Sequence, residues 1–309
     1  MNSQKNEIQR ILVALDGSER AFKTIRYLCT FKPFLKKELV LHNVITKVPE
    51  CFYDLKNDPF SSKTTAQVFA WELEHKSQIE TFMDKSQQML ISAGFDPEAI
   101  RVVIAQRKRG IARDIMDESH NGYAALLIRR RGNAQAFLPI VMGSVSTKLV
   151  EKLDTLPIML AGIHEVNHSL LIAIDGSQGA KRAVHFVIKM IEKIPCRIIL
   201  CCVLRDFNVA NNQCSDNCVS VGYEEIETAV TEARDILECG GIPKNNIGIK
   251  IIHNAKSRSA AIVETARLEN CDTFVFGRKG RSDTREFDIG RVPWKVIHGE
   301  REKSVWLVP

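Results

Sequence analysis

The chain has 309 residues, of which 45% are hydrophobic, 26% charged and 7% aromatic. These proportions exclude a disordered or fibrous protein, and the length predicts two domains that each bury a core. The formal net charge of +6 is small for this length, so nucleic-acid binding is not favoured. Because the apolar runs are only strand-sized and the first residues lack an apolar signal region, we expect no membrane span and no export.

The nine cysteines are odd in number and irregularly spaced. In a chain of this length, such usage favours reduced thiols and a cytoplasmic location. Cys214 and Cys218 lack the paired knuckles or histidines of a zinc site, so we predict no metal ion. The sequence has no Walker A loop, nucleophile elbow or His-Glu-x-x-His motif, and no general base pairs with a nucleophile. We therefore predict no catalytic residue, and an ordinary hydrolase or transferase is not favoured.

Apolar and helix-period segments alternate along the first half of the chain. Strands are predicted at residues 9–15, 38–45, 100–106, 124–129 and 157–161, and helices at 18–32, 64–93, 110–121 and 144–154. A polar connection, residues 49–65, follows the second strand, and connections of this length are usually functional.

The second half repeats this alternation. Strands are predicted at residues 169–174, 196–204, 247–253, 272–277 and 304–308, and helices at 177–193, 222–240, 257–270 and 291–299. Strands that are apolar throughout, such as residues 170–174, are typical of a parallel sheet covered on both faces. Right-handed crossovers then predict a doubly wound α/β domain in each half.

Three pairs of similar segments indicate an internal duplication. Ile-Leu-Val-Ala-Leu-Asp-Gly-Ser at residues 11–18 matches Leu-Leu-Ile-Ala-Ile-Asp-Gly-Ser at 170–177. Further along, apolar runs lead into Arg-Arg-Gly at 130–132 and Gly-Arg-Lys-Gly at 277–280, and a short apolar strand closes each half. The order of these landmarks predicts two domains, residues 1–163 and 164–309.

The ligand crevice of a doubly wound domain lies at the carboxyl ends of its strands. This rule places Asp16, Val44, Arg107, Arg129 and Gly132 on one rim, and Asp175, Val203, His253 and Gly277 on the other. The two aspartates are either turn residues or acceptors for a base or sugar, and the following serines, Ser18 and Ser177, are predicted to cap the next helices. Glycines after the fourth strand would let backbone N–H groups approach an anion at a helix N-terminus.

The glycine spacing of the second half is specific. Gly277 and Gly280 are separated by two residues, and nine more precede Gly290. With the repeated Asp-Gly-Ser turn, this pattern resembles a tandem universal stress protein, whose ATP-binding members carry Gly, two residues, Gly, nine residues, Gly, then Ser or Thr. The resemblance covers almost the whole chain. It implies two five-stranded parallel-sheet domains of strand order 3-2-1-4-5, similar to adenine nucleotide alpha hydrolases, that pair through the last strands, 157–161 and 303–309, as a pseudo-dimer within one chain.

Residue by residue, the resemblance implies adenine-side contacts at Asp16 and Val44. Ribose and phosphate contacts would come from Gly132, Gly143, Ser144 and Ser146 in the first half, and the second-half counterparts are Asp175, Val203, Gly277, Gly280 and Gly290. The implied function is a cytoplasmic stress response in which at least one domain binds ATP, with Mg²⁺, and signals to an unknown protein partner. Slow ATP hydrolysis and further homodimerisation stay open.

Both copies depart from the family pattern. Arg129 replaces the first glycine of the first half, and ten residues rather than nine separate Gly132 from Gly143. In the second half, Arg291 replaces Ser or Thr, and Pro293 removes a backbone donor from the last helix. The alternative is therefore a degenerate member that serves as a protein-interaction module or as a receptor for another anionic ligand.

Two basic runs, residues 107–109 and 129–131, are predicted on the same rim of the first half. Arginine suits phosphate and carboxylate through paired hydrogen bonds, so Arg107, Arg109, Arg129 and Arg131 are candidates for an anion site. Two other interpretations stay open: the side chains point into solvent, or Arg129 fills the nucleotide pocket and prevents binding.

Overall fold

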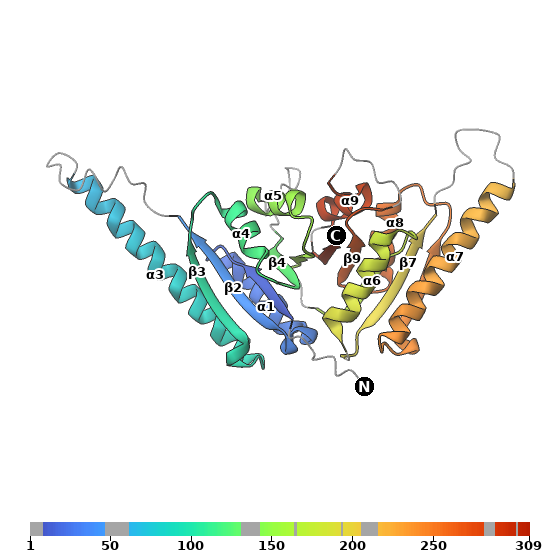
Figure 1. The fold of residues 1–309 in the computed structure, drawn as a ribbon, viewed down its shortest axis with the longest axis horizontal. Coiled ribbons are helices and arrows are strands. Elements are labelled where there is room, and N and C mark those ends of the chain that lie inside the picture. Colours follow the sequence, from blue (N-terminus) through green and yellow to red (C-terminus); the bar gives the residue numbers. More distant parts are fainter. Residues whose placement is uncertain are drawn as a thin grey trace.

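The computed structural model describes residues 9–46, 62–130, 143–163, 166–192, 194–204, 216–280, 288–300 and 302–309 (Figure 1). The first half consists of β1 (Arg10–Ala14), η1 (Glu19–Ala21), α1 (Phe22–Thr30), η2 (Lys32–Lys36), β2 (Glu38–Ile45), α3 (Ser62–Ser92), η4 (Pro97–Ala99), β3 (Ile100–Gln106), α4 (Ile111–Ser119), β4 (Ala125–Arg129), α5 (Ser144–Lys152) and β5 (Ile158–Ala161).

The second half repeats the alternation. It consists of β6 (Ser169–Ala173), α6 (Gln178–Ile191), β7 (Arg197–Val203), α7 (Asp216–Cys239), η5 (Lys244–Asn246), β8 (Ile247–Ile252), α8 (Arg258–Leu268), β9 (Thr273–Gly277), α9 (Arg291–Gly299) and β10 (Ser304–Val308). The predicted strands are confirmed to within about a residue or two at each end, because continuous apolar runs mark strands that are buried on both faces.

All the strands found in the described residues belong to one ten-stranded sheet of order β3-β2-β1-β4-β5-β10-β9-β6-β7-β8. Within each half the order is 3-2-1-4-5 and the pairing is parallel, which confirms the predicted fold. The halves join through β5 and β10, which pair antiparallel, with Trp306 in register with Met159. This pairing confirms the expected meeting of the last strands, whereas the domain limits stay a prediction.

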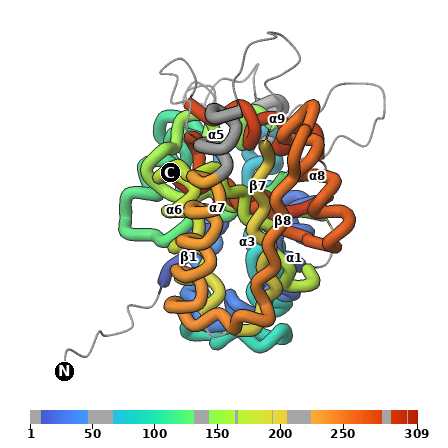
Figure 2. Tube along the Cα trace, turned by 90° about the vertical axis from the view of Figure 1, so that its right-hand side faces the viewer, coloured from blue at the N-terminus to red at the C-terminus, as the bar shows by residue number. Residues whose placement is uncertain are grey.

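Helices cover both faces of the sheet, and each face carries one core that runs through both halves. Residues of α1, α3, α6 and α7 pack in the first core, and residues of α4, α5, α8 and α9 pack in the second. The long helices α3 and α7 lie at the two outer ends of the molecule (Figure 1). In the perpendicular view, α5 and α9 again lie together at one end of the sheet (Figure 2).

One predicted helix, residues 18–32, is divided in the structure. It consists of the 3₁₀ turn η1, the helix α1 and a second 3₁₀ turn, η2, that contains Pro33. Proline disfavours the α conformation in the residue before it, so a helix cannot continue through Lys32. Helix α1 accordingly ends at Thr30, and Phe31 leaves helical geometry with ψ 85°.

An aromatic cluster fills the junction between the halves on the first face. Trp306 is fully buried among Phe31, Phe34 and Phe186, with ring centroids 5.6 to 6.2 Å away. Its indole Nε1 donates a hydrogen bond to the Tyr27 hydroxyl over 3.0 Å. Because the rings come from both halves, the junction buries apolar area as a domain core does.

Candidate functional site

The crevice of the second half forms where β6 and β9 end. The Asp175 carboxylate accepts a hydrogen bond from the backbone N–H of Ser177 over 3.0 Å, and Gly280 lies against the same carboxylate. A Cβ on Gly280 would lie 2.5 Å from Asp175 Oδ2. Only glycine therefore lets the loop approach the carboxylate this closely.

Gly277 has a different neighbour, the start of α6. A Cβ on Gly277 would overlap the carbonyl carbon of Gly179 and lie 2.8 Å from the Ala180 nitrogen. The predicted cap of α6 is confirmed, since the Ser177 hydroxyl accepts a hydrogen bond from Ala180 N–H over 3.1 Å. The glycine after β9 therefore has a packing role as well as its predicted place in the crevice.

Gly290 closes the loop of the second crevice and is the N-cap of α9. Its backbone N–H donates to the carbonyl of Arg278 over 2.8 Å, which ties the two ends of the loop together. Arg291, the first residue of α9, is exposed. The end of the loop thus combines a helix N-terminus with a cation, an arrangement that suits an anionic group.

The crevice of the first half contains an ion pair. Arg129 lies where the second half has Gly277, and its guanidinium donates to Asp16 Oδ2 over 3.0 Å. The Arg129 side chain is 16% exposed, so it fills space at the end of β4. This contact agrees with the interpretation that Arg129 occupies the pocket, and the carboxylate that the resemblance assigns to adenine is already paired.

Asp16 is further held by the turn that follows it. The Ser18 hydroxyl donates to Asp16 Oδ1 over 2.6 Å, and Ser18 N–H donates to the same oxygen over 3.1 Å. Burial alone would raise the pKa of Asp16, but the bonds from Ser18 and the charge of Arg129 together lower it below its ordinary value. The prediction that Ser18 caps the next helix is therefore wrong, because its hydroxyl is committed to Asp16.

The two basic runs lie on one rim but are separated. Arg107 follows β3 and Arg129 ends β4, so β2 and β1 lie between them, about 14 Å at the usual strand spacing. The Asp114 carboxylate accepts the backbone N–H groups of Lys108 and Arg109 over 2.8 and 3.0 Å, and the Arg109 guanidinium pairs with Asp117. Of the arginines predicted to form an anion site, Arg109 is thus paired with a carboxylate of α4 and Arg129 with Asp16.

The remaining candidates lie near the ends of their strands and helices. Val44 and Val203 are buried near the ends of β2 and β7, and Gly143 is the N-cap of α5. Ser144 is exposed at the first position of α5, and the Ser146 hydroxyl donates to the Arg129 carbonyl over 3.4 Å. Two candidates, Gly132 and Arg131, lie outside the described residues.

Two arginines that sequence reasoning did not select are buried at the junction of the halves. Arg130 is 5% exposed and Arg278 is 3% exposed, and both guanidinium groups bind backbone carbonyls of the opposite half. In the sequence they look like any loop arginine. The one available signal is their matching position, since each follows the last residue of the fourth strand of its half.

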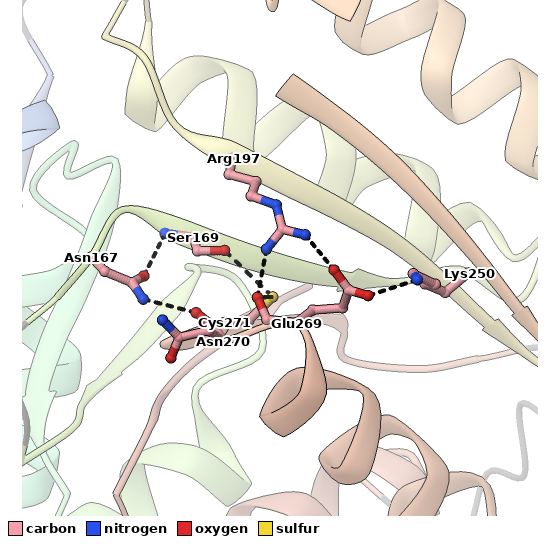
Figure 3. A network of polar contacts seen from close by, with 7 residues as sticks. All are labelled: Asn167, Ser169, Arg197, Lys250, Glu269, Asn270 and Cys271. Atoms are coloured by element: carbon pink, nitrogen blue, oxygen red, sulfur yellow. Dashed lines mark hydrogen bonds and ion pairs between the residues drawn. The ribbon is translucent and has the colours of Figure 1, made fainter. Parts of the chain in front are cut away.

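A separate polar network lies at the opposite end of the second-half strands (Figure 3). Glu269 pairs with Lys250 over 2.6 Å and with Arg197, which also donates to the Glu269 carbonyl. Asn167 binds the carbonyl of Asn270. These bonds are internal and tie the strand starts together. Within the described residues, no group of three or more His, Cys, Asp and Glu side chains is arranged to hold a metal ion.

The comparisons with known proteins identify the fold. A universal stress protein from Archaeoglobus fulgidus is similar over 99% of this chain and 98% of its own, at 20% identity and a TM-score of 0.62. A protein of unknown function from Pseudomonas aeruginosa is similar over 98% of this chain and 93% of its own, at 14% identity and a TM-score of 0.56. A comparison with curated protein sequences finds no match.

None of the described helices combines the length and the hydropathy that crossing a membrane requires. The model of the universal stress protein family matches residues 167–309. The first half carries the same strand order and is joined to the second in one sheet. Residues 167–309 therefore match the universal stress protein family, and the likeness of the whole chain to the solved structures shows that it has their fold.

Proposed function

We propose that the second half binds an adenine nucleotide, ATP with Mg²⁺, and that the protein serves in a cytoplasmic stress response. The observation that carries this proposal is the close approach of Gly280 to the Asp175 carboxylate. It brings the glycine loop beside an acceptor for adenine or ribose, next to the N-terminus of α9. Such a terminus favours phosphate through its backbone N–H groups and its partial positive charge.

Two features of α9 decide how the phosphates would be held. Pro293 has no N–H, which removes one donor from the first turn. The exposed guanidinium of Arg291 offsets this loss, because it can bind phosphate oxygens in pairs. Phosphate recognition in this half would thus depend more on a side-chain cation than on the hydroxyl of the family pattern.

The first half favours a second candidate function. The Asp16–Arg129 pair engages the carboxylate that adenine would use, and Asp117 of α4 engages Arg109 of the predicted anion site. We infer that this half holds no nucleotide and serves as the interaction half, toward a protein partner or another ligand.

The test compares Gly280→Ala with wild type by calorimetric titration with ATP and Mg²⁺. The added Cβ displaces the Asp175 carboxylate, so we expect at least about 10-fold weaker binding, a loss of about 1.4 kcal/mol. Gly299→Ala is the matched control, because nothing lies within 4 Å of its Cβ.

Two results would remove the proposal. One is wild-type protein that carries no nucleotide after purification and gives no heat with millimolar ATP. The other is unchanged affinity in the Gly280→Ala variant, which would take the site away from the second half.

A further inference from the structure

Each of the buried arginines Arg130 and Arg278 binds the end of a helix in the opposite half. The Arg278 guanidinium donates to the carbonyls of Val150, Glu151 and Leu153 over 2.7, 2.8 and 2.8 Å. These carbonyls lie at the C-terminus of α5, where a helix has no intrahelical partners left for them. The second half thus caps the last helix of the first half.

In the same way, an arginine of the first half caps the last helix of the second half. The Arg130 guanidinium donates to the carbonyls of Val296, Ile297 and Glu300 at the end of α9, and to Lys303 over 2.9 Å. Burial lowers the pKa of Arg130 to about 10, so the group stays charged at neutral pH. The negative end of the α9 dipole stabilises that charge.

Each capped helix starts at the crevice of its own half. Helix α5 begins after Gly143 in the first crevice, and its C-terminus contacts Arg278. Helix α9 begins after Gly290 in the second crevice, and its C-terminus contacts Arg130. The residue that opens α9 is also bonded to the residue that holds α5, because Gly290 N–H donates to the Arg278 carbonyl over 2.8 Å. Two hydrogen-bond steps therefore connect the second crevice with the end of α5.

We propose that Arg278 transmits a change at the second crevice to α5, so that a ligand bound in one half alters the helix that opens the crevice of the other. The ligand-dependent part rests on the nucleotide site proposed for the second half. Arg130 caps α9 from the first half in return. A rigid helix carries the change, since α5 packs in the second core through the buried residues Leu149 and Val150.

The experiment follows amide hydrogen exchange of the full chain in wild type and in Arg278→Gln. Without ligand, we expect Arg278→Gln to speed exchange in residues 149–153 about 10-fold, because fraying helix ends exchange faster. If Arg278 only capped α5, the change in exchange would be confined to residues 149–153. Transmission predicts that exchange also changes at the first turn of α5, residues 144–147.

Lys152→Gln is the matched control. Lys152 pairs with Asp288 over 3.2 Å and so joins the same helix end to the same loop, but both side chains are more than half exposed. Exposed pairs contribute little, so we expect less than a twofold change in this variant. If Arg278→Gln does not fold, Arg278→Lys keeps the charge with fewer bonds and should show a smaller change of the same pattern.

Saturating ATP and Mg²⁺ provide the second part of the experiment. In wild type, ATP should change exchange at residues 290–294 and also in α5; in Arg278→Gln, only the change at 290–294 should remain. An ATP effect on α5 that persists in Arg278→Gln would overturn the proposal. If ATP does not bind wild type, the proposed nucleotide site is wrong, but the ligand-free comparison still tests the role of Arg278. A change in exchange confined to residues 149–153 overturns the proposed transmission, and a change that reaches residues 144–147 supports it.

Discussion

The two crevices differ in what faces the aspartate at the end of the first strand. In the second half Asp175 meets a glycine, and a serine caps the helix that follows. In the first half Asp16 pairs with the guanidinium of Arg129 and also accepts a hydrogen bond from the Ser18 hydroxyl. The same strand–turn–helix frame therefore places its aspartate against a glycine in one half and against an arginine in the other.

The largest effect on stability should follow from adding a side chain at Gly277, where β9 contacts the start of α6. In Gly277→Ala the new Cβ collides with backbone atoms of Gly179 and Ala180, which cannot move aside as a side chain can. We expect the free energy of unfolding in urea to fall by about 2 to 3 kcal/mol. Gly299→Ala, which meets open space, should stay within about 1 kcal/mol of wild type. Equal stability of the two variants would show that the glycines do not pack as described.

An intermediate effect on stability should come from one pair of equivalent residues in the second strand of each half, β2 and β7. His42 in β2 is buried, and its Nδ1 has no hydrogen-bond partner among the described residues. Burial lowers the pKa of His42, only partly offset by Glu118 and Asp114. Cys201 has the equivalent place in β7, and burial raises the pKa of its thiol to about 12.

These shifts predict a difference in acid. Below its unfolded pKa, near 6.5, His42 binds a proton in the unfolded chain but not in the folded one, so stability falls as the pH falls from about 6.5 toward the folded pKa. Cysteine stays neutral over this range. His42→Cys should therefore flatten the decline by up to about 1.4 kcal/mol per pH unit, as urea unfolding at pH 7.5, 6.5 and 5.5 would show. Burial also lowers the pKa of His168, so part of the decline should remain.

The smallest effect should come from breaking the ion pair of the first crevice. Arg129→Ala removes a partly exposed pair, so we expect a loss of no more than about 1 kcal/mol in stability. Titration should give ATP affinity and stoichiometry within twofold of wild type. A marked loss of affinity would place the nucleotide in the first half and reverse the comparison.

Much of the fold could be predicted because its determinants are local. Apolar runs such as residues 170–174 identify buried strands, and the repeated Asp-Gly-Ser turn reveals the duplication, whereas the strand order was implied only by the family resemblance. The division of residues 18–32 and the choice of Ser18 between helix and carboxylate depend on neighbours that the chain brings together only on folding.

The candidate site was less predictable. Arg129 and Arg130 are adjacent and chemically identical, yet one lies in the crevice and the other caps a helix of the opposite half. The pairing of β5 with β10 decides this, because it brings α9 within reach of Arg130. A residue's partner across the junction cannot be read from spacing within one half.

The register between β5 and β10 places Trp306 opposite Met159, and these two residues have the same position in their respective halves. A dimer of identical subunits with this register would have to set tryptophan against tryptophan or methionine against methionine at that point. Joining both copies in one polypeptide lifts this restriction, since a bulky ring can face a slender side chain. It also makes the seam insensitive to dilution, because the two edges never separate into independent molecules.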